Sequence, residues 1–359
     1  MSSLITLVVS ILVFGVIILV HELGHFLAAR RFGIRVVEFS IGFGPALWSK
    51  VKNGTRYSLR LIPIGGYNLM DDGETEEEEE NPPAPVPGGI RPLVVCGKAF
   101  PEATAWQRFF VIAAGAAMNF LLGFLLLVVL LSYRQVLTSK IIYDFSDNAR
   151  SQATGLQSGD EILAINGHHC FVAEDVYYEL QRTTDFTADF TVLRNGQRVV
   201  VQDVQFDSTT DEDGNVSMVL DFRVYGISVT PRSVFKTAVN YFIYYARIIL
   251  RGFQDLFVGQ VGLQDLSGPV GVVTAVGQAV GDGWRTVLEL SALLTINLGI
   301  FNLLPIPGLD GGKLLFLAWE GITRHPVPER IQLVVNTAGI LLLLGLMILV
   351  TWQDVFRIF

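Results

Sequence analysis

Residues 17–25 read IILVHELGH and carry an H-E-x-x-H pattern at the end of an apolar run. On a helix, His21 and His25 are one turn apart, so both imidazoles leave the same face. Two neutral imidazoles at that spacing can take two positions of a tetrahedral Zn²⁺ site. Glu22 follows the first histidine and is placed to take a proton from an activated water molecule. The pattern therefore predicts a catalytic zinc site.

The residues around this pattern place it at or inside a membrane. Residues 4–20 carry no charged side chain, and the pattern follows them directly. Ionisable groups at membrane depth are costly and usually functional. A chance pattern in a structural helix is the alternative, and the apolar flank argues against it. Arg30, Arg31 and Arg35 come next, which favours the cytoplasmic side for this end of the helix.

The composition is that of a membrane protein. The 359 residues are 51% hydrophobic and 17% charged, and a soluble domain seldom combines these values. Eight acidic residues lie within residues 71–80, so the net charge of −8 is a local feature that argues against a nucleic-acid partner. No G-x-x-x-x-G-K-[ST] loop is present, so no nucleotide is implied. Cys96 and Cys170 are too few for a disulfide framework or a cysteine-based metal site.

Four apolar stretches predict four transmembrane helices. We expect residues 4–29 to form an uncleaved first span rather than a signal peptide, because residues 1–3 carry no Lys or Arg. The other spans are expected at residues 109–131, 288–304 and 334–350. With the end of the first span in the cytoplasm, residues 133–285 and the C-terminus would lie outside.

Residues 34–67 predict β-structure next to the first span. Residues 36–41 have strand composition, residues 42–45 read GFGP and predict a turn, and residues 57–67 form a second extended stretch ended by glycines. Non-helical backbone at membrane depth must be buried in protein or line a wet cavity. Two interpretations stay open: a re-entrant sheet beside the metal whose edge pairs with an extended peptide, and an ordinary cytoplasmic hairpin.

The third expected span runs into a helix break that leaves a lone aspartate. Residues 303–313 read LLPIPGLDGGK, and the two prolines end the helix at membrane depth. Taken alone, Asp310 is equally an N-cap of the next helix or a cation ligand. Together with H-E-x-x-H, we interpret it as the third zinc ligand. Asn119, in the second span, either packs against another helix or reaches the metal site.

Residues 141–229 predict a soluble α+β module. Residues 153–167 read ATGLQSGDEILAING and combine a turn, a strand and an Asn-Gly hairpin signal. This stretch resembles the PDZ motif A-G-L-x-x-G-D-x-I-x-x-I-N-G, with Thr154 inserted. The resemblance implies binding of an extended peptide by strand addition, and a spacer or steric gate is the alternative. A short helix is expected at residues 176–181, a second hairpin through Asn195-Gly196, and an exposed loop at His168 and His169.

Three features together resemble the site-2 protease family. They are H-E-x-x-H on the first span, the PDZ-like insert, and residues 302–311, which match N-x-x-P-x-P-x-L-D-G at every fixed position. The likeness covers nearly the whole chain and is greatest to the bacterial regulator-of-sigma-E protease group. It implies Zn²⁺ held by His21, His25 and Asp310, with Glu22 catalytic.

The same resemblance implies an activity and its setting. The protein would be an intramembrane zinc endopeptidase of the bacterial inner membrane, with the PDZ-like domain outside. Its partners would be the lipid bilayer and single-span membrane proteins, such as anti-sigma factors or remnant signal peptides. Asn302 would help hold the substrate strand, and Gly65, Gly66 and Tyr67 would bind substrate on a membrane-associated β-element. Some members carry two PDZ domains, and this chain has room for one.

The expected fold is a polytopic α-helical membrane protein with four transmembrane helices, re-entrant β-elements and one inserted PDZ-like α+β domain. The expected segments are the first helix with the β-region (1–70), an acidic and Pro-rich solvated linker (71–105), the second helix (106–132), the PDZ-like domain (141–229), amphipathic interfacial helices with a loop (233–285), the third transmembrane region (286–320) and the fourth helix (332–352).

The alternative function is a non-enzymatic scaffold whose PDZ-like domain binds peptide ends around a structural zinc. Such a site would need four protein ligands, and the sequence offers three. The interpretation as a metal transporter is weaker still, since ionisable groups do not recur along several of the expected spans.

Overall fold

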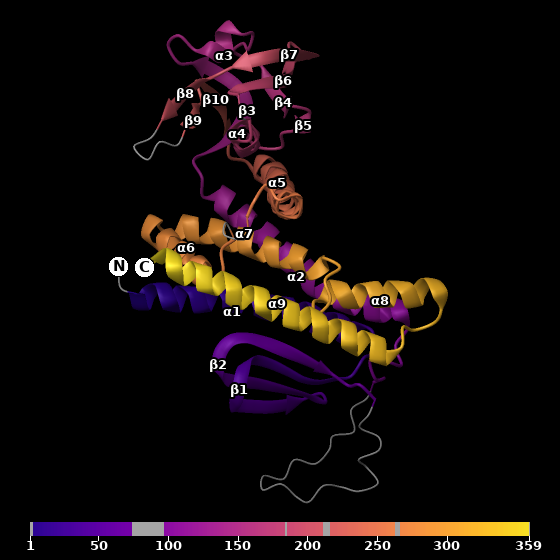
Figure 1. The fold of residues 1–359 in the computed structure, drawn as a ribbon. Coiled ribbons are helices and arrows are strands. Elements are labelled where there is room, and N and C mark those ends of the chain that lie inside the picture. Colours follow the sequence, from indigo (N-terminus) through magenta and orange to yellow (C-terminus); the bar gives the residue numbers. More distant parts are fainter. Residues whose placement is uncertain (1–2, 74–96, 184, 211–215, 263–265, 359) are drawn as a thin grey trace, which may run out of the picture. The chain divides into compact units, whose positions relative to one another are not determined.

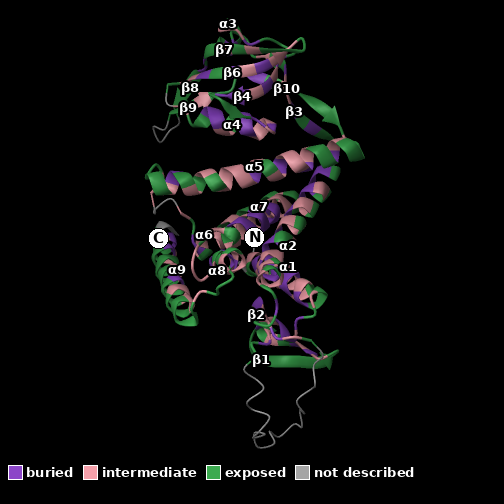
Figure 2. Cartoon of the chain, turned by 90° about the vertical axis from the view of Figure 1, so that its right-hand side faces the viewer, coloured by how far each residue is buried: buried purple, intermediate pink, exposed green. Residues whose placement is uncertain are grey.

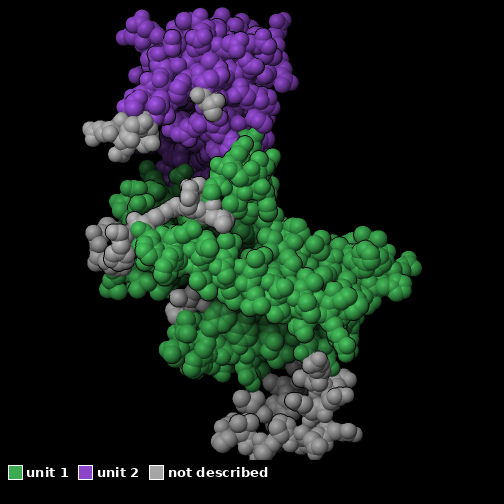
Figure 3. All heavy atoms as spheres, viewed as in Figure 1, with its two compact units in different colours: residues 1–126, 249–359 green, residues 127–248 purple. Residues whose placement is uncertain are grey.

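The computed structural model describes residues 3–73, 97–183, 185–210, 216–262 and 266–358. They form two units, one of residues 1–126 with 249–359 and one of residues 127–248 (Figure 3). The division falls inside two long helices, α2 (Ala105–Ser132) and α5 (Pro231–Val258). The predicted linker lies mostly outside the described residues.

Within the part of the chain that the structure describes, four helices are long and apolar enough to cross a membrane, as the sequence predicts. Besides α2 they are α1 (Ser3–Arg31), α7 (Trp284–Leu303) and α9 (Glu329–Ile358). Only 17% of the most apolar window of α1 and 11% of that of α9 is buried in the protein. The outer faces of these helices are thus apolar and exposed (Figure 2), which suits contact with lipid rather than water.

The break after α7 has a local cause. Leu304 is extended, as a residue before proline prefers to be, and α7 therefore ends at Leu303. The chain re-enters a helix as α8 (Asp310–Thr323). A Cβ on Gly311 would lie 1.9 Å from the Leu304 carbonyl oxygen, so the return of the chain requires a glycine there.

Strands β1 (Val36–Lys52) and β2 (Thr55–Met70) form a sheet that packs on α1 (Figure 1). Residues 38–41 of β1 pair with two segments of β2, residues 66–69 and residues 56–59. The start of β1 is therefore an inner strand, and residues 66–69 are an outer one. The ring of Phe26, one residue after His25, lies 5.1 Å from the Phe39 ring and so joins the sheet to the helix that carries the histidines.

The turn expected at residues 42–45 was wrong. β1 continues through this stretch, where Gly42 and Gly44 have φ angles of 86° and 84° and bend the strand. The chain reverses later, at Asn53-Gly54, between the paired residues Lys52 and Thr55. Both loop residues have positive φ, 51° and 78°, as a two-residue hairpin turn of type I′ requires.

The second unit is built on an antiparallel sheet of order β10-β3-β4-β6-β7, with β5 paired to β4. Its elements are β3 (Val136–Phe145), α3 (Arg150–Ala153), β4 (Glu161–Ile165), β5 (His168–His169), α4 (Ala173–Gln181), β6 (Thr187–Arg194), β7 (Gln197–Gln205) and β10 (Phe222–Ser228). A separate hairpin joins β8 (Asp207–Thr210) and β9 (Val216–Val219). The expected helix and the expected hairpin at Asn195-Gly196 are confirmed. His168 and His169 are exposed, although they form a short strand rather than a loop.

Helices α5 and α6 (Pro269–Asp282) cover most of residues 233–285, the segment expected to be amphipathic and interfacial. In the second unit, α5 packs on α4: Arg247 binds the buried carboxylates of Asp175 and Glu179, and the hydroxyl of Tyr241 donates to Glu174. In the first unit, α6 begins where the Asp354 carboxylate of α9 accepts a 2.8 Å hydrogen bond from a backbone N–H of its first turn. Each helix is thus fixed by polar contacts at buried carboxylates.

Candidate metal centre

Helix α1 brings two histidines together at one point. His21 and His25 are 7% and 8% exposed. Their ring centroids lie 4.7 Å apart and their Nε2 atoms 3.1 Å apart. This is the one-turn spacing that the sequence pattern predicts, and both rings present the same kind of nitrogen.

Asp310 reaches the same point from the first turn of α8. Its Oδ2 lies 3.1 Å from His21 Nε2 and 3.2 Å from His25 Nε2, although 289 residues separate it from the first histidine. Leu309 is the N-cap of α8, and no side chain caps the helix. The alternative in which Asp310 is the N-cap therefore does not hold. Among the described residues, these three side chains form the one group of His, Cys, Asp or Glu with a metal-binding arrangement.

The spacing and chemistry of these atoms fit a zinc ion. Zinc–ligand distances of about 2.0–2.2 Å in a tetrahedral site put neighbouring ligand atoms about 3.3–3.5 Å apart. The observed separations are 3.1, 3.1 and 3.2 Å. His25 Nδ1 donates to the Val111 carbonyl oxygen at 2.9 Å, so in the neutral ring Nε2 holds a lone pair. That lone pair faces the half-buried Asp310 carboxylate, and the two repel unless a cation lies between them.

One face of α2 packs against both imidazoles. Val111, Gly115 and Asn119 are spaced four residues apart and so share this face. A Cβ on Gly115 would lie 2.5 Å from His25 Nε2, so only glycine leaves room for the rings. The Asn119 side chain is fully buried, with its Nδ2 3.3 Å from His21 Nδ1. Both expected roles of Asn119 are thus compatible with the structure, since its side chain contacts another helix, α1, at a histidine of the candidate metal site.

Glu22 lies beside the donor atoms without being one of them. It is half-buried on α1, and its charge interacts with both histidines and with Asp310. Lys313, an exposed residue of α8, adds a positive charge on the same side. A carboxylate next to a metal-binding group, but outside it, is placed to accept and return a proton.

The predicted substrate-binding residues fall into two places. Asn302, in the last turn of α7, has its Nδ2 3.5 Å from His21 Nε2, a contact at the outer limit of a hydrogen bond. Gly65, Gly66 and Tyr67 lie in β2, where Tyr67 stacks on Phe43 of β1 with ring centroids 6.3 Å apart and has the Arg60 guanidinium of β2 5.3 Å from its ring centroid. The structure brings Asn302, but not these three residues, into contact with the histidines.

A further carboxylate is buried within the sheet. Glu38 is 7% exposed and accepts hydrogen bonds from the Ser58 hydroxyl and from Arg60 Nη2, the latter at 2.7 Å. Burial opposes its ionisation, but the hydrogen bonds outweigh burial and hold the pKa of Glu38 below its ordinary value. This carboxylate has a permanent cation beside it and needs no metal.

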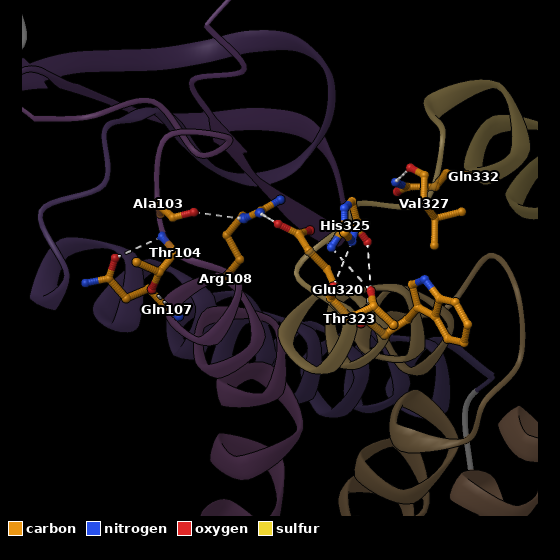
Figure 4. A network of polar contacts seen from close by, with 10 residues as sticks. Ala103, Thr104, Gln107, Arg108, Glu320, Thr323, His325, Val327 and Gln332 are labelled. Carbon is orange, nitrogen blue, oxygen red and sulfur yellow. Dashed lines mark hydrogen bonds and ion pairs between the residues drawn. The ribbon is translucent and has the colours of Figure 1, made fainter.

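The far end of α8 is tied to α2 by an ion pair (Figure 4). Arg108 donates from Nε to the Ala103 carbonyl oxygen at 3.1 Å, and its Nη2 binds the Glu320 carboxylate. Thr323 and His325 close the following turn, with His325 Nδ1 2.8 Å from the Thr323 carbonyl oxygen. The helix that delivers Asp310 is therefore held at both ends.

Sequence reasoning missed two of these features. The Val111 carbonyl that orients His25 is a backbone group, so the identity of residue 111 does not predict this hydrogen bond. The Arg108–Glu320 pair joins residues 212 positions apart, in segments that were treated as transmembrane ends. The four-residue spacing of Gly115 and Asn119 was the available signal for the face of α2 that meets the histidines.

Comparison with known proteins agrees with this geometry. Residues 9–346 match the family described as Peptidase family M50. The chain is 33% identical to zinc metalloprotease RasP of Shouchella clausii over 99% of each chain. It is 30% identical to the regulator of sigma-W protease RasP of Bacillus subtilis, again over 99% of each, and 29% identical to zinc metalloprotease RasP of Geobacillus kaustophilus over 97% of each.

Proposed function

The chain belongs to peptidase family M50, and on that premise we propose that it is an intramembrane zinc endopeptidase that cleaves single-span membrane proteins. It is a metalloprotease with a zinc cofactor, like its relatives. The observation that carries the proposal is the meeting of three donor atoms from α1 and α8 beside Glu22, within a helix long and apolar enough to cross a membrane. Ionisable groups gathered at that depth are expected to be catalytic.

The three donors divide the work of holding the ion. His21 and His25 would hold the ion through Nε2 and Asp310 through its carboxylate, and a set of three protein ligands is typical of catalytic rather than structural zinc sites. When bound, zinc activates a water molecule as a nucleophile and polarises the scissile carbonyl. The hydrogen bond from His25 Nδ1 to Val111 fixes that ring, so its Nε2 keeps the direction that binding needs.

Glu22 moves the proton. Its carboxylate accepts a proton from the attacking water and delivers it to the leaving amine, so one group serves as base and then as acid. Half-burial beside the donor atoms strengthens its electrostatic interaction with them. Removal of a general base of this kind lowers the rate by roughly 10²–10⁴-fold.

An extended substrate fits beside this centre. A helical substrate hides its peptide bonds, so a segment must unwind and be held extended. Among the described strands, residues 66–69 of β2 pair with β1 on one side only, so their other edge can pair with that segment by strand addition. We assign Gly65, Gly66 and Tyr67 to this edge, and Asn302 to an amide contact near the cleaved bond.

The rest of the proposal concerns the setting. Residues 141–229 would be a PDZ-like domain that meets substrates outside a bacterial plasma membrane, while the basic end of α1 lies in the cytoplasm. One relative is named a regulator of sigma-W protease, which supports regulated cleavage of anti-sigma factors or remnant signal peptides. A scaffold with a structural zinc is the weaker alternative. A structural site is closed by four protein ligands, and the group among the described residues has three.

The test is proteolysis by the purified full-length protein in detergent, with a tagged single-span membrane protein as probe. We expect Glu22→Gln to keep its zinc and to lose cleavage by roughly 10²–10⁴-fold. Glu320→Gln is the matched control, because it changes another half-buried carboxylate of the same unit and should stay within a few-fold of wild type. Wild-type cleavage by Glu22→Gln would reject the assignment. Chelation should abolish activity, and added zinc should restore it.

A further inference from the structure

The two histidines are oriented by different kinds of group on α2. His25 Nδ1 donates to a backbone carbonyl, that of Val111, at 2.9 Å. His21 Nδ1 faces a side chain, with Asn119 Nδ2 at 3.3 Å. A backbone carbonyl survives any substitution, whereas a side-chain contact can be removed. The orientation of His21 therefore depends on the identity of residue 119.

The chemistry of metal binding decides which atom of the Asn119 amide must face the histidine. His21 Nε2 lies 3.1 Å from both Asp310 Oδ2 and His25 Nε2, so Nε2 is the atom directed at the metal. A neutral imidazole with its lone pair on Nε2 carries its proton on Nδ1. The partner of Nδ1 must then accept a hydrogen bond, and an NH₂ group cannot do so.

A second observation gives the same answer. Asn119 is fully buried, and its Oδ1 is without a hydrogen-bond partner among the described residues. A buried amide oxygen without a partner carries a full desolvation penalty. Rotation of the amide about its terminal bond exchanges Oδ1 and Nδ2. After that rotation the oxygen accepts the proton of His21 Nδ1, and the orphaned acceptor is satisfied.

We propose that Asn119 is a positioning residue that holds His21 in its metal-binding tautomer by accepting a hydrogen bond from Nδ1. The inference rests on the proposed zinc site. The backbone carbonyl of Asn119 accepts a hydrogen bond from the Thr295 hydroxyl of α7 at 3.2 Å. This contact fixes the backbone from which the side chain projects. Asn119 acts through His21 and does not touch the reacting atoms.

The test separates an acceptor from a space-filling side chain. Asn119→Leu keeps the approximate size and removes the acceptor, and Asn119→Asp keeps an acceptor in the same place. Asn297→Leu, which changes an amide on α7, is the matched control. For each full-length protein we would measure zinc affinity by competition with a chelator, the visible spectrum of the cobalt-substituted form, and the unfolding temperature of the metal-free form.

We expect Asn119→Leu to bind zinc roughly 10–100-fold more weakly than wild type, the usual effect of losing an outer-sphere partner of a ligand. Asn119→Asp should stay within about threefold of wild type, and its cobalt spectrum should match. Asn297→Leu should bind as wild type does. Undiminished affinity in Asn119→Leu would overturn the inference, and so would equal losses in the Leu and Asp variants, which would indicate packing. If the wild-type protein binds no zinc, it is the proposed function that fails.

Discussion

The two ends of α8 are held by carboxylates of similar exposure that have different partners. The Asp310 side chain is 16% exposed and lies against two imidazoles. The Glu320 side chain is 18% exposed and lies against the Arg108 guanidinium. Both contacts bridge segments far apart in sequence, and both are within ion-pair distance. Burial and proximity alone therefore do not separate a reactive site from a structural one.

The partner makes the difference. A guanidinium is always charged, so Glu320 is neutralised by the protein itself. Neutral imidazoles supply lone pairs and no charge, so Asp310 with His21 and His25 still requires a cation. One end of α8 is a completed ion pair, and the other is a set of donors that a divalent metal would complete. The predictions below test this contrast from both ends.

The largest effect is expected at the metal end. Asp310→Asn removes the only formal charge among the three donors, so zinc content should fall and cleavage should drop by more than the roughly 10–100-fold that loss of an outer-sphere partner causes. Metal analysis and proteolysis of the purified variant are the measurements. Glu320→Gln makes the same chemical change at the other end and should retain its zinc. If the two variants behaved alike, the contrast would be void.

A smaller effect is expected when the rings are displaced without loss of a donor. In Gly115→Ala the new methyl would lie 2.5 Å from His25 Nε2 and 2.8 Å from His21 Cε1, so the imidazoles must shift. We expect zinc affinity to fall on the order of 10-fold. Gly345→Ala on α9, where an added Cβ meets no atom within 4 Å, is the control. Unchanged affinity in Gly115→Ala would mean that the donors tolerate displacement.

The contrast also explains how much could be predicted from the sequence. Local spacing fixed the pair His21 and His25, the helix break before Asp310, and the hairpin at Asn195-Gly196, because each depends on neighbouring residues only. The four apolar helices followed from composition and length. The proposed third ligand followed from chemistry, since an aspartate at membrane depth and a histidine pair that lacks a further ligand suggest a shared cation.

Contacts set by tertiary packing could not be predicted. The carbonyl of Val111 and the pairing of Arg108 with Glu320 depend on how α2 meets α1 and α8, which no local pattern encodes. The turn was misplaced for another reason. GFGP at residues 42–45 has turn composition, but its glycines bend a continuous strand, and the chain reverses at Asn53-Gly54, a pair typical of two-residue hairpins.

At the structural end we expect a loss of stability with little loss of zinc. Arg108→Met leaves the Glu320 carboxylate without its cation, which should cost about 1–3 kcal/mol of stability. Replacing both residues, as Arg108→Met with Glu320→Leu, removes the uncompensated charge and should recover at least half of that loss. Thermal unfolding and zinc content of the single and double variants are the measurements. A single variant that lost its zinc while unfolding normally would show that the ion pair belongs to the metal site.

The smallest effect concerns the buried carboxylate of Glu38, which like that of Glu320 has an arginine partner. Because its pKa is lowered in the folded protein, its contribution to stability is fully present above the unfolded pKa of about 4.3 and is lost as the pH falls through the folded pKa. Glu38→Gln should therefore be less stable than wild type by about 1 kcal/mol at pH 7, and the difference should shrink below pH 4. Unfolding temperatures of both proteins between pH 7 and pH 3 measure this. A deficit that stayed constant with pH would mean that Glu38 acts through shape and neutral hydrogen bonds, and an arginine partner would then no longer be enough to mark a carboxylate as a charged structural contact.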